Sequence, residues 1–171
     1  MIRRVDPGED AVIALIARRM RLTLMEVIGP EEGERMHTME WLVDRVRFHL
    51  DPARSTAAVF VAHAEPRTPG ELGPIAGHTI VRIQQEDAGV VGLFSTTYVA
   101  HEHRRQGFAH ALLTTGEGWI TEHGMHTAAT WTAADNAKLI ALYEAHGYAI
   151  TTRDPPMVRL ERRVGCAKGV T

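Results

Sequence analysis

The sequence has a single cysteine, Cys166, among its 171 residues. No disulfide can form within such a chain, and a reducing cytoplasm is the simplest setting for it. Long apolar runs are also missing, since none approaches the ~20 residues that a membrane helix needs. The residues that follow Met1 lead into an amphipathic pattern and lack the apolar core of a signal peptide. We therefore expect a cytoplasmic protein with no membrane association.

An excess of either charge is absent as well. The chain has 19 Lys and Arg residues against 21 Asp and Glu, a formal charge of -2, whereas a dedicated nucleic-acid binder is usually basic. Hydrophobic residues make up 44% of the chain, too many for a disordered protein. The length is typical of one domain. We expect a single domain over residues 1–164 and a flexible tail over residues 165–171.

What the sequence does have is regular apolar spacing. A short strand is expected at residues 2–5, and Asp6-Pro7-Gly8-Glu9 has the composition of a capping box that starts a helix. The apolar residues after it recur at steps of three and four, which is typical of one buried helix face. A second helix is predicted from near Pro30 to Pro52, with an apolar stripe at Met36, Met39, Val43, Val46 and Leu50.

The remaining pattern alternates between strands and helices. It predicts strands at residues 56–64, 75–85, 89–99, 125–131, 148–152 and 157–162. Helices are expected at residues 105–123 and from Asp135 or Asn136 to Gly147. The strands that flank the first of these helices should be parallel, because a crossover helix connects them. The prediction is a mixed α+β fold, with a mostly antiparallel sheet of about seven strands and helices on both faces.

A strand–loop–helix junction at residues 97–109 is the most informative segment. The strand ends there, a short loop follows, and Gly107 is expected in the first turn of the next helix. The first N–H groups of a helix have no internal partner, and the helix dipole adds positive potential. A glycine lets a ligand approach this backbone, and Arg104 and Arg105 add positive charge. A phosphate site and a plain helix start both fit, since the P-loop and dinucleotide glycine patterns are absent.

The segment Arg104-Arg105-Gln106-Gly107-Phe108-Ala109 resembles the Q/R-x-x-G-x-G/A signature of the GNAT superfamily, the N-acetyltransferases that use acetyl-CoA. The strand end before it, from Tyr98, is similar to that family's L-y-V-x-P-x-x-R, with His101 at the proline position. A second block, residues 136–148, resembles the family's N-x-x-A-x-x-x-Y-x-x-x-G-F, with Leu139 and Tyr148 as mild departures. One predicted strand separates the two blocks, as the family's fold requires.

The resemblance implies where a cofactor binds. The pyrophosphate of CoA would lie on the backbone amides of the loop, at Arg104, Arg105, Gln106, Gly107, Phe108 and Ala109. The pantetheine arm would run beside the strand end at Tyr98 and Val99, in a wedge where the two parallel strands splay apart. The amide near Val99 would polarise the thioester carbonyl. Asn136 would contact the pantetheine arm, although asparagine at this position is also a typical helix N-cap.

Tyr143 matches the family's tyrosine that protonates the departing CoA thiolate. A phenol with a pKa of ~10 can donate to a thiolate and be re-protonated from solvent; alternatively, Tyr143 only anchors its helix on the sheet. The acceptor amine must also lose a proton, and many relatives use a glutamate on the strand before the loop. Residues 90–97 contain no carboxylate. The base is therefore open between Glu86, Asp87, His78 and a water held by Ser95 and Thr97.

The ten histidines are the unusual count in the composition. The H-E-x-x-H zinc pattern is absent, because His101-Glu102-His103 has the wrong spacing, and we expect no metal. His101, His103 and His110 cluster beside the loop, where partial protonation favours phosphates. Cys166 has no base near it in the sequence, which argues against a covalent mechanism.

The acceptor side has no motif. In the family it is built from the first two helices and the last two strands. Six acids and one base lie between Leu22 and Asp44, and they either attract a cationic amine or form a solvated surface. The expected function is transfer of an acetyl group from acetyl-CoA to a primary amine of a small molecule or peptide. Another acyl-CoA donor, a hydroxyl acceptor and a non-catalytic acyl-CoA-binding module stay open, and a homodimer is expected by analogy alone.

Overall fold

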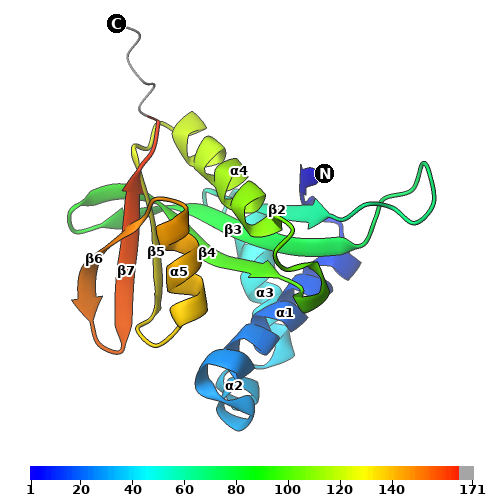
Figure 1. Cartoon of the computed structure of the whole chain (residues 1–171), viewed down its shortest axis with the longest axis horizontal. Helices are drawn as coiled ribbons and strands as arrows, with labels where there is room; N and C mark the ends of the chain where they lie inside the picture. The colour runs from blue at the N-terminus through cyan, green and yellow to red at the C-terminus, as the bar shows by residue number, and fades with distance from the viewer. Residues whose placement is uncertain (166–171) are drawn as a thin grey trace, which may run out of the picture.

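A computed structural model describes residues 1–165 of the chain. The expected tail lies outside these residues apart from Gly165, and so does Cys166. Seven strands form one sheet in the order β1-β2-β3-β4-β5-β7-β6 (Figure 1). All neighbouring strands are antiparallel except β4 and β5, which are parallel. This confirms the mixed α+β prediction, including its parallel pair. No helix in the described part is long and apolar enough to span a membrane.

The first helix starts later than the capping-box pattern predicts. Strand β1 covers Ile2–Arg4, and helix α1 covers Asp10–Ile28. Between them the chain makes a turn, with the Glu9 N–H donating to the Asp6 carbonyl (3.1 Å). The Glu9 carboxylate accepts from the Asp6 N–H (2.8 Å) and forms an ion pair with Arg3 of β1 (2.7 Å). The predicted reciprocal cap is therefore only half formed, and an ion pair to the first strand takes its place.

The predicted second helix is two helices. Helix α2 covers Pro30–Met36, and α3 covers Met39–Leu50. His37 and Thr38 are extended between them, and the Thr38 hydroxyl accepts from the Trp41 N–H (3.1 Å). This side-chain cap satisfies one of the donors that the start of α3 leaves open. The prediction of one continuous helix was wrong because the apolar spacing of Met36 and Met39 continues across the break.

The other elements follow the predicted order with small shifts. The strands are β2 (Ala57–His63), β3 (Ile75–Glu86), β4 (Gly89–Val99), β5 (Thr127–Ala133), β6 (Ala149–Asp154) and β7 (Met157–Arg163). The helices are α4 (Phe108–Glu122) and α5 (Ala137–Ala145), and His101–His103 form one 3-10 turn. Helix α4 begins three residues later than expected, because Arg105 and Gly107 both adopt left-handed backbone conformations.

Two apolar clusters cover the two faces of the sheet. One joins α4 and α5 to the sheet and includes Leu112, Tyr143 and Val81. The other joins α1 and α3 to it and includes Ile13 and Ile80, among others. Ile80 and Val81 are neighbours on β3, so their membership of different clusters follows from the alternation of side chains along a strand. In Figure 1, α4 crosses the sheet in front while α1 and α3 lie behind it.

Helix α4 packs closely on the sheet because it has a glycine at the contact. A Cβ at Gly116 would lie 2.5 Å from the Phe94 ring of β4. Any larger residue there would push the helix outward. The close packing fixes the N-terminus of α4 next to the C-terminal end of β4, where the predicted site lies.

Candidate active site

Strands β4 and β5 pair over a short distance and then separate. Their register joins Gly92 to Ala128, Leu93 to Ala129 and Phe94 to Thr130, and no strand in residues 1–165 pairs with β4 on that side beyond Phe94. The separation begins at a β-bulge: Val81 of β3 faces Phe94 and Ile80 faces Thr96, so Ser95 has no opposite residue. A bulge bends its strand. The bend leaves one edge of β4 open from Ser95 to Val99, as the predicted wedge requires.

The open edge presents backbone groups of Thr97 and Val99. Val99 faces Gly77 of β3, and the Ala100 N–H donates to the Ala76 carbonyl (2.8 Å). This bond marks Gly77 and Val99 as a pair without mutual hydrogen bonds, so the Val99 N–H points away from β3. The alternation along the strand gives Thr97 the same orientation. An extended ligand chain can therefore add to this edge as another strand would.

The loop before α4 collects unpaired amides. The first helical bond is from the Ala111 N–H to the Gly107 carbonyl (3.0 Å). Within the described residues, no backbone or side-chain acceptor takes the six preceding amides, those of Arg105, Gln106, Gly107, Phe108, Ala109 and His110. The helix dipole adds positive potential at the same place. Such a run of amides is suited to an anion, and above all to a phosphate.

Two left-handed residues shape this loop. Gly107, the N-cap of α4, has φ 83° and ψ -2°, and Arg105 has φ 60°. A side chain resists this conformation at a cost of ~1 kcal/mol, which Gly107 avoids and Arg105 does not. A Cβ at Gly107 would have no heavy atom within 4 Å. The space beside the loop backbone is thus open to a ligand.

Arg104 supports the end of β4. Its Nε donates to the Val99 carbonyl (3.1 Å), and its guanidinium lies 3.8 Å from the Glu26 carboxylate near the end of α1. The side chain therefore provides a hydrogen-bond donor to the Val99 carbonyl, and the N–H of Val99 stays available to a ligand. Arg104 also ties the loop before α4 to helix α1 on the opposite face of the sheet.

The Tyr143 hydroxyl lies at the other wall of the wedge. It is 3.3 Å from Thr97 Oγ1, which is 2.9 Å from Thr79 Oγ1, and the Thr79 hydroxyl donates to the Thr96 carbonyl. Tyr143 is 1% exposed. Burial raises the pKa of Tyr143 to about 12, although its hydrogen bond with Thr97 opposes this rise. The phenol therefore keeps its proton at any neutral pH, as a proton donor must.

Asn136 has the structure of a helix cap. Its Oδ1 accepts from the Leu139 N–H (3.3 Å), and its Nδ2 donates to Thr132 Oγ1 of β5 (3.2 Å). The capping alternative raised by the sequence is therefore present. The side chain joins the start of α5 to β5, at the wall of the wedge opposite β4.

The candidate bases differ in their suitability. Glu86 and Asp87 lie at the β3–β4 turn, and ten strand residues at ~3.3 Å each separate that turn from Val99. Glu86 is also bonded to Arg159. His78 is fully buried, and burial together with the nearby Arg19 charge lowers its pKa to about 3. A histidine with this pKa is a poor base at neutral pH. Ser95 and Thr97 lie on the open edge of β4 itself. Their hydroxyls are not bases, so of the four candidates a water held by them is the one that fits as the proton acceptor.

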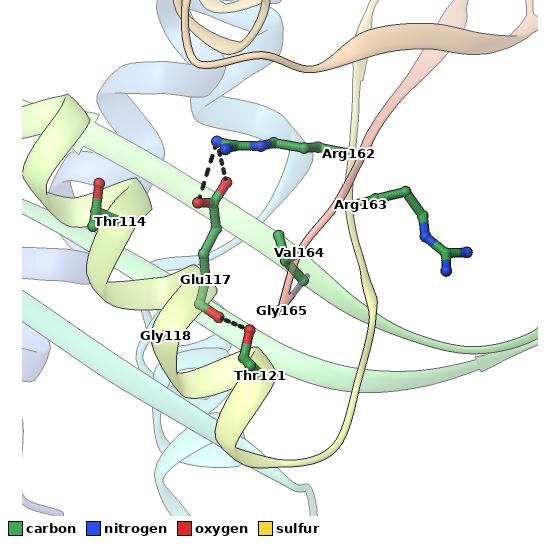
Figure 2. Close-up of a pocket in the computed structure, with 8 residues that line it drawn as sticks. All are labelled: Thr114, Glu117, Gly118, Thr121, Arg162, Arg163, Val164 and Gly165. Carbon is green, nitrogen blue, oxygen red and sulfur yellow. Dashed lines mark hydrogen bonds and ion pairs between the residues drawn. The ribbon is translucent and has the colours of Figure 1, made fainter. Parts of the chain in front are cut away.

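Two hollows in the described residues lie away from these groups. One, of about 270 Å³, is between α4 and the end of β7 (Figure 2). The other, of about 450 Å³, is between the last turn of α4 and the chain around β1 and β2. Neither includes a residue of the predicted site. Within the same residues, no group of three His, Cys, Asp or Glu side chains is placed to hold a metal ion.

The model of the Acetyltransferase (GNAT) family matches residues 23–148. The chain belongs to this family. It is 32% identical over 94 residues to the uncharacterized N-acetyltransferase YuaI of Bacillus subtilis (strain 168), a match that covers 55% of this chain and 51% of YuaI. The chain thus spans about half the length of the curated relative that it matches.

Solved structures share the fold of this GNAT chain. The NatC complex bound to Gag peptide and CoA contains a chain with a TM-score of 0.71 and 13% identity, over 96% of this chain and 98% of that one. The PaiA N-acetyltransferase of Thermoplasma acidophilum, in complex with coenzyme A, has a TM-score of 0.64 and 12% identity, over 95% and 98% of the two chains. At these identities the likeness concerns the fold alone.

The structure of this GNAT chain brings together most of the residues that the sequence singles out. Tyr98, Val99 and the loop from Arg104 to Ala109 follow one another along the chain, while Asn136, the N-cap of α5, and Tyr143 of α5 lie across the wedge. Sequence reasoning named Thr97 only as a holder of water and missed its contact with Tyr143. It also missed the contact of His110 with His146, whose side chains lie 2.7 Å apart.

Proposed function

We propose that this chain is an N-acetyltransferase that moves an acetyl group from acetyl-CoA to a primary amine by direct attack. The observation that best supports the proposal is the continuous path from six free amides, along the open edge of β4, to the buried phenol of Tyr143. A phosphate-bearing, extended thioester needs each of these features in this order. The resemblance of both motif blocks to the GNAT signatures supports the same cofactor.

In the proposed complex, the pyrophosphate lies on the amides of residues 105–110. The pantetheine arm pairs with the edge of β4 at Thr97 and Val99, with Tyr98 between them and Asn136 opposite. The thioester oxygen accepts from the Val99 N–H, which stabilises the charge that develops on it. Arg104 holds the Val99 carbonyl and so fixes the direction of that amide. No metal takes part in this scheme.

The proposed transfer moves protons at the nitrogen and at the sulfur. An ammonium acceptor first loses a proton to water at the open edge near Ser95 and Thr97. The neutral amine then attacks the thioester carbon, a C–N bond forms, the C–S bond breaks, and the nitrogen loses a second proton to water as the amide forms. The departing thiolate takes the proton of the Tyr143 hydroxyl, which solvent replaces through the hydroxyl of Thr97. An alkylammonium with a pKa of ~10 is only about 0.25% neutral at pH 7.4, so the rate should rise with pH through neutrality.

The acceptor is proposed to approach from the side of α1, α2 and α3. All six acids between Leu22 and Asp44 are exposed there. Three of them have cationic partners: Glu26 with Arg104, Glu32 with Arg35 and Asp44 with Arg54. The others, Glu31, Glu34 and Glu40, support a preference for a cationic amine. We further propose that residues 1–164 act as one domain in the cytoplasm. We also propose a homodimer, and light scattering of the purified protein tests this oligomeric state.

A non-catalytic acyl-CoA-binding module is the second candidate. It is favoured by the absence of a carboxylate on β4 and by the burial of His78. Assays of thiol release with acetyl-CoA and a longer acyl-CoA, each with amine and alcohol acceptors, separate the candidates. Turnover with acetyl-CoA and amines supports the proposal. Turnover with alcohols or with the longer donor alone assigns another acyl transfer, and binding of both donors without any turnover favours the module.

A further inference from the structure

A chain of hydrogen-bonding groups leads from the interior to the first turn of α4. Nδ1 of His110 is 2.7 Å from Nδ1 of His146, which follows α5, and the two ring centroids are 4.3 Å apart. The other ring nitrogen of His146 is 3.3 Å from Glu117, two turns further along α4. The three side chains are thus connected in the order Glu117, His146, His110. None of these groups takes part in the mechanism above.

The interior end of this row of side chains, formed by Glu117 and His146, is largely buried, and the negative charge of Glu117 is neutralised by an arginine. His146 is 7% exposed. The Glu117 carboxylate accepts from Arg162 of β7 at 3.3 and 3.4 Å, as Figure 2 shows, and Arg162 also donates to the His146 carbonyl (2.7 Å). Tyr148 packs on the same ring, with centroids 6.3 Å apart. These groups hold the His146 imidazole in one orientation.

The arrangement fixes which nitrogens bear hydrogen. Burial lowers the pKa of His146, so this imidazole is neutral and has one N–H. Its Nε2 lies 3.3 Å from a Glu117 oxygen, outside the geometry of a hydrogen bond. It bears the hydrogen because a bare nitrogen there would face another acceptor. Its Nδ1 is then bare and can only accept. The Nδ1 of His110 must therefore be the donor in the 2.7 Å contact, and no group in residues 1–165 forms a hydrogen bond with Nε2 of His110.

His110 is also part of the phosphate loop. Its amide is the last of the six that have no acceptor, and its side chain is exposed. Because phosphate oxygens only accept hydrogen bonds, a partner nitrogen has to be an N–H. The Nδ1–H is committed to His146, so His110 can serve a phosphate only by taking a second proton on Nε2.

We propose that Nε2 of His110 binds a phosphate group of the CoA carrier and takes up a proton when it does so, with His146 and Glu117 as positioning residues. The inference rests on the proposed function, because it assumes that CoA binds at the loop. It goes further by making cofactor affinity depend on pH. Proton uptake on binding means that affinity falls as pH rises, by up to tenfold per pH unit.

Other titratable groups near the loop have to be distinguished from His110. His146, the residue after α5, lies against its ring, and Glu117 of α4 and Arg162 of β7 in turn contact His146. His101, His103 and Arg105 belong to the segment that precedes α4. The CoA phosphates themselves also titrate. A comparison between the wild type and a His110 variant cancels all of these contributions except that of His110.

Calorimetric titration with acetyl-CoA tests the proposal. The heat is measured in two buffers of equal pH and different ionisation enthalpies, which gives the number of protons taken up. We expect His110→Gln to take up fewer protons than the wild type and to bind about five to tenfold more weakly at pH 6, a difference that shrinks by pH 9. His110→Lys should bind with the same reduced proton uptake and little dependence on pH. His123→Gln, at the far end of α4, is the matched control and should behave as the wild type.

The positioning role has its own readout. His146→Gln removes the bare nitrogen that orients His110, so it should shift the pH dependence of binding without abolishing binding. The acetyl ester of dephospho-CoA distinguishes the two phosphate sources: uptake that persists with it assigns the pyrophosphate, and uptake that disappears assigns the 3′-phosphate. Equal proton uptake by the wild type and His110→Gln would overturn the inference while leaving the proposed function intact. Absence of acetyl-CoA binding to the wild type would overturn both.

Discussion

The hydroxyl of Tyr143 on α5 lies 3.3 Å from the hydroxyl of Thr97 on β4. The contact spans the place where β4 and β5 have separated, so it joins the two walls of the wedge. Because burial raises the pKa of Tyr143 to about 12, the phenol is a hydrogen-bond donor throughout the neutral range. Thr97 in turn can pass a proton inward to Thr79 or outward to the edge of the strand. The pair is the proposed route by which the departing thiolate is protonated.

Removal of the phenol should slow turnover without weakening cofactor binding. We expect Tyr143→Phe to lower kcat by about a hundredfold, which is within the range for a lost proton donor, and to leave the Kd for acetyl-CoA within twofold. Steady-state kinetics and calorimetry measure the two quantities. Tyr148→Phe is the matched control, since its ring lies 4.9 Å from that of Tyr143 in the same core. An unchanged kcat in Tyr143→Phe would show that this tyrosine only anchors its helix.

A side chain at Gly107 should block the phosphate loop. Gly107→Glu places a carboxylate beside six free amides and forces a non-glycine residue into φ 83°. We expect loss of measurable acetyl-CoA binding by calorimetry, with helix content retained by circular dichroism. Gly118→Ala lies on the same helix, where a Cβ also has no atom within 4 Å. That control should bind acetyl-CoA normally, and full affinity in Gly107→Glu would contradict the placement of the phosphates.

Two buried histidines should make the fold sensitive to acid. Burial lowers the pKa values of His49 and His78 to about 3. An unfolded histidine takes a proton below about pH 6.5, whereas these two stay neutral in the fold, so their stabilising effect is complete above pH 6.5 and is lost as pH falls toward 3. Each should account for about 1 to 2 kcal/mol of the free energy of unfolding lost between pH 7 and pH 5.

Urea unfolding at pH 7, 6 and 5 measures this loss. His49→Leu and His78→Leu should each flatten the pH dependence, whatever their effect on stability at pH 7. His123→Gln replaces an exposed histidine and should keep the wild-type slope. Equal slopes in all four proteins would mean that the buried imidazoles become protonated without unfolding.

The break between α2 and α3 gives a prediction about stability alone. Thr38 caps α3 through its hydroxyl, so Thr38→Ala should lower the free energy of unfolding by about 1 kcal/mol. Thr38→Ser keeps the acceptor and should lose much less. Thermal unfolding followed by circular dichroism compares the three proteins. A Thr38→Ala protein as stable as the wild type would assign the break to packing instead of to the cap.

The sequence predicts this fold well where a local pattern decides the structure. The hairpin of β3 and β4, the parallel relation of β4 to β5 and the capping role of Asn136 all follow from nearby residues. The start of α1 was predicted too early because Glu9 is drawn into an ion pair with Arg3 of β1. The break at Thr38 was missed because the stripe of Met36 and Met39 has helical spacing on both sides of it.

The site is less predictable because its contacts join residues far apart in the chain. Tyr143 and Thr97 are 46 positions apart, and His110 and His146 are 36 positions apart. No periodicity relates such residues, so only the packing of α4 and α5 on the sheet reveals the contacts. The amides of the loop, in contrast, belong to consecutive residues, and a glycine at a helix start was enough to indicate them.

The central claim is that the chain transfers an acetyl group from acetyl-CoA, held at the loop of residues 105–110, to a primary amine. Its most direct test is to measure, in one reaction, the free thiol released and the acetylated amine formed, over a panel that includes cationic amines and peptides. The account predicts that at least one amine gives thiol and acetylated product in equal amounts, and that Gly107→Glu gives neither. Tight binding of acetyl-CoA with no product from any amine would contradict it.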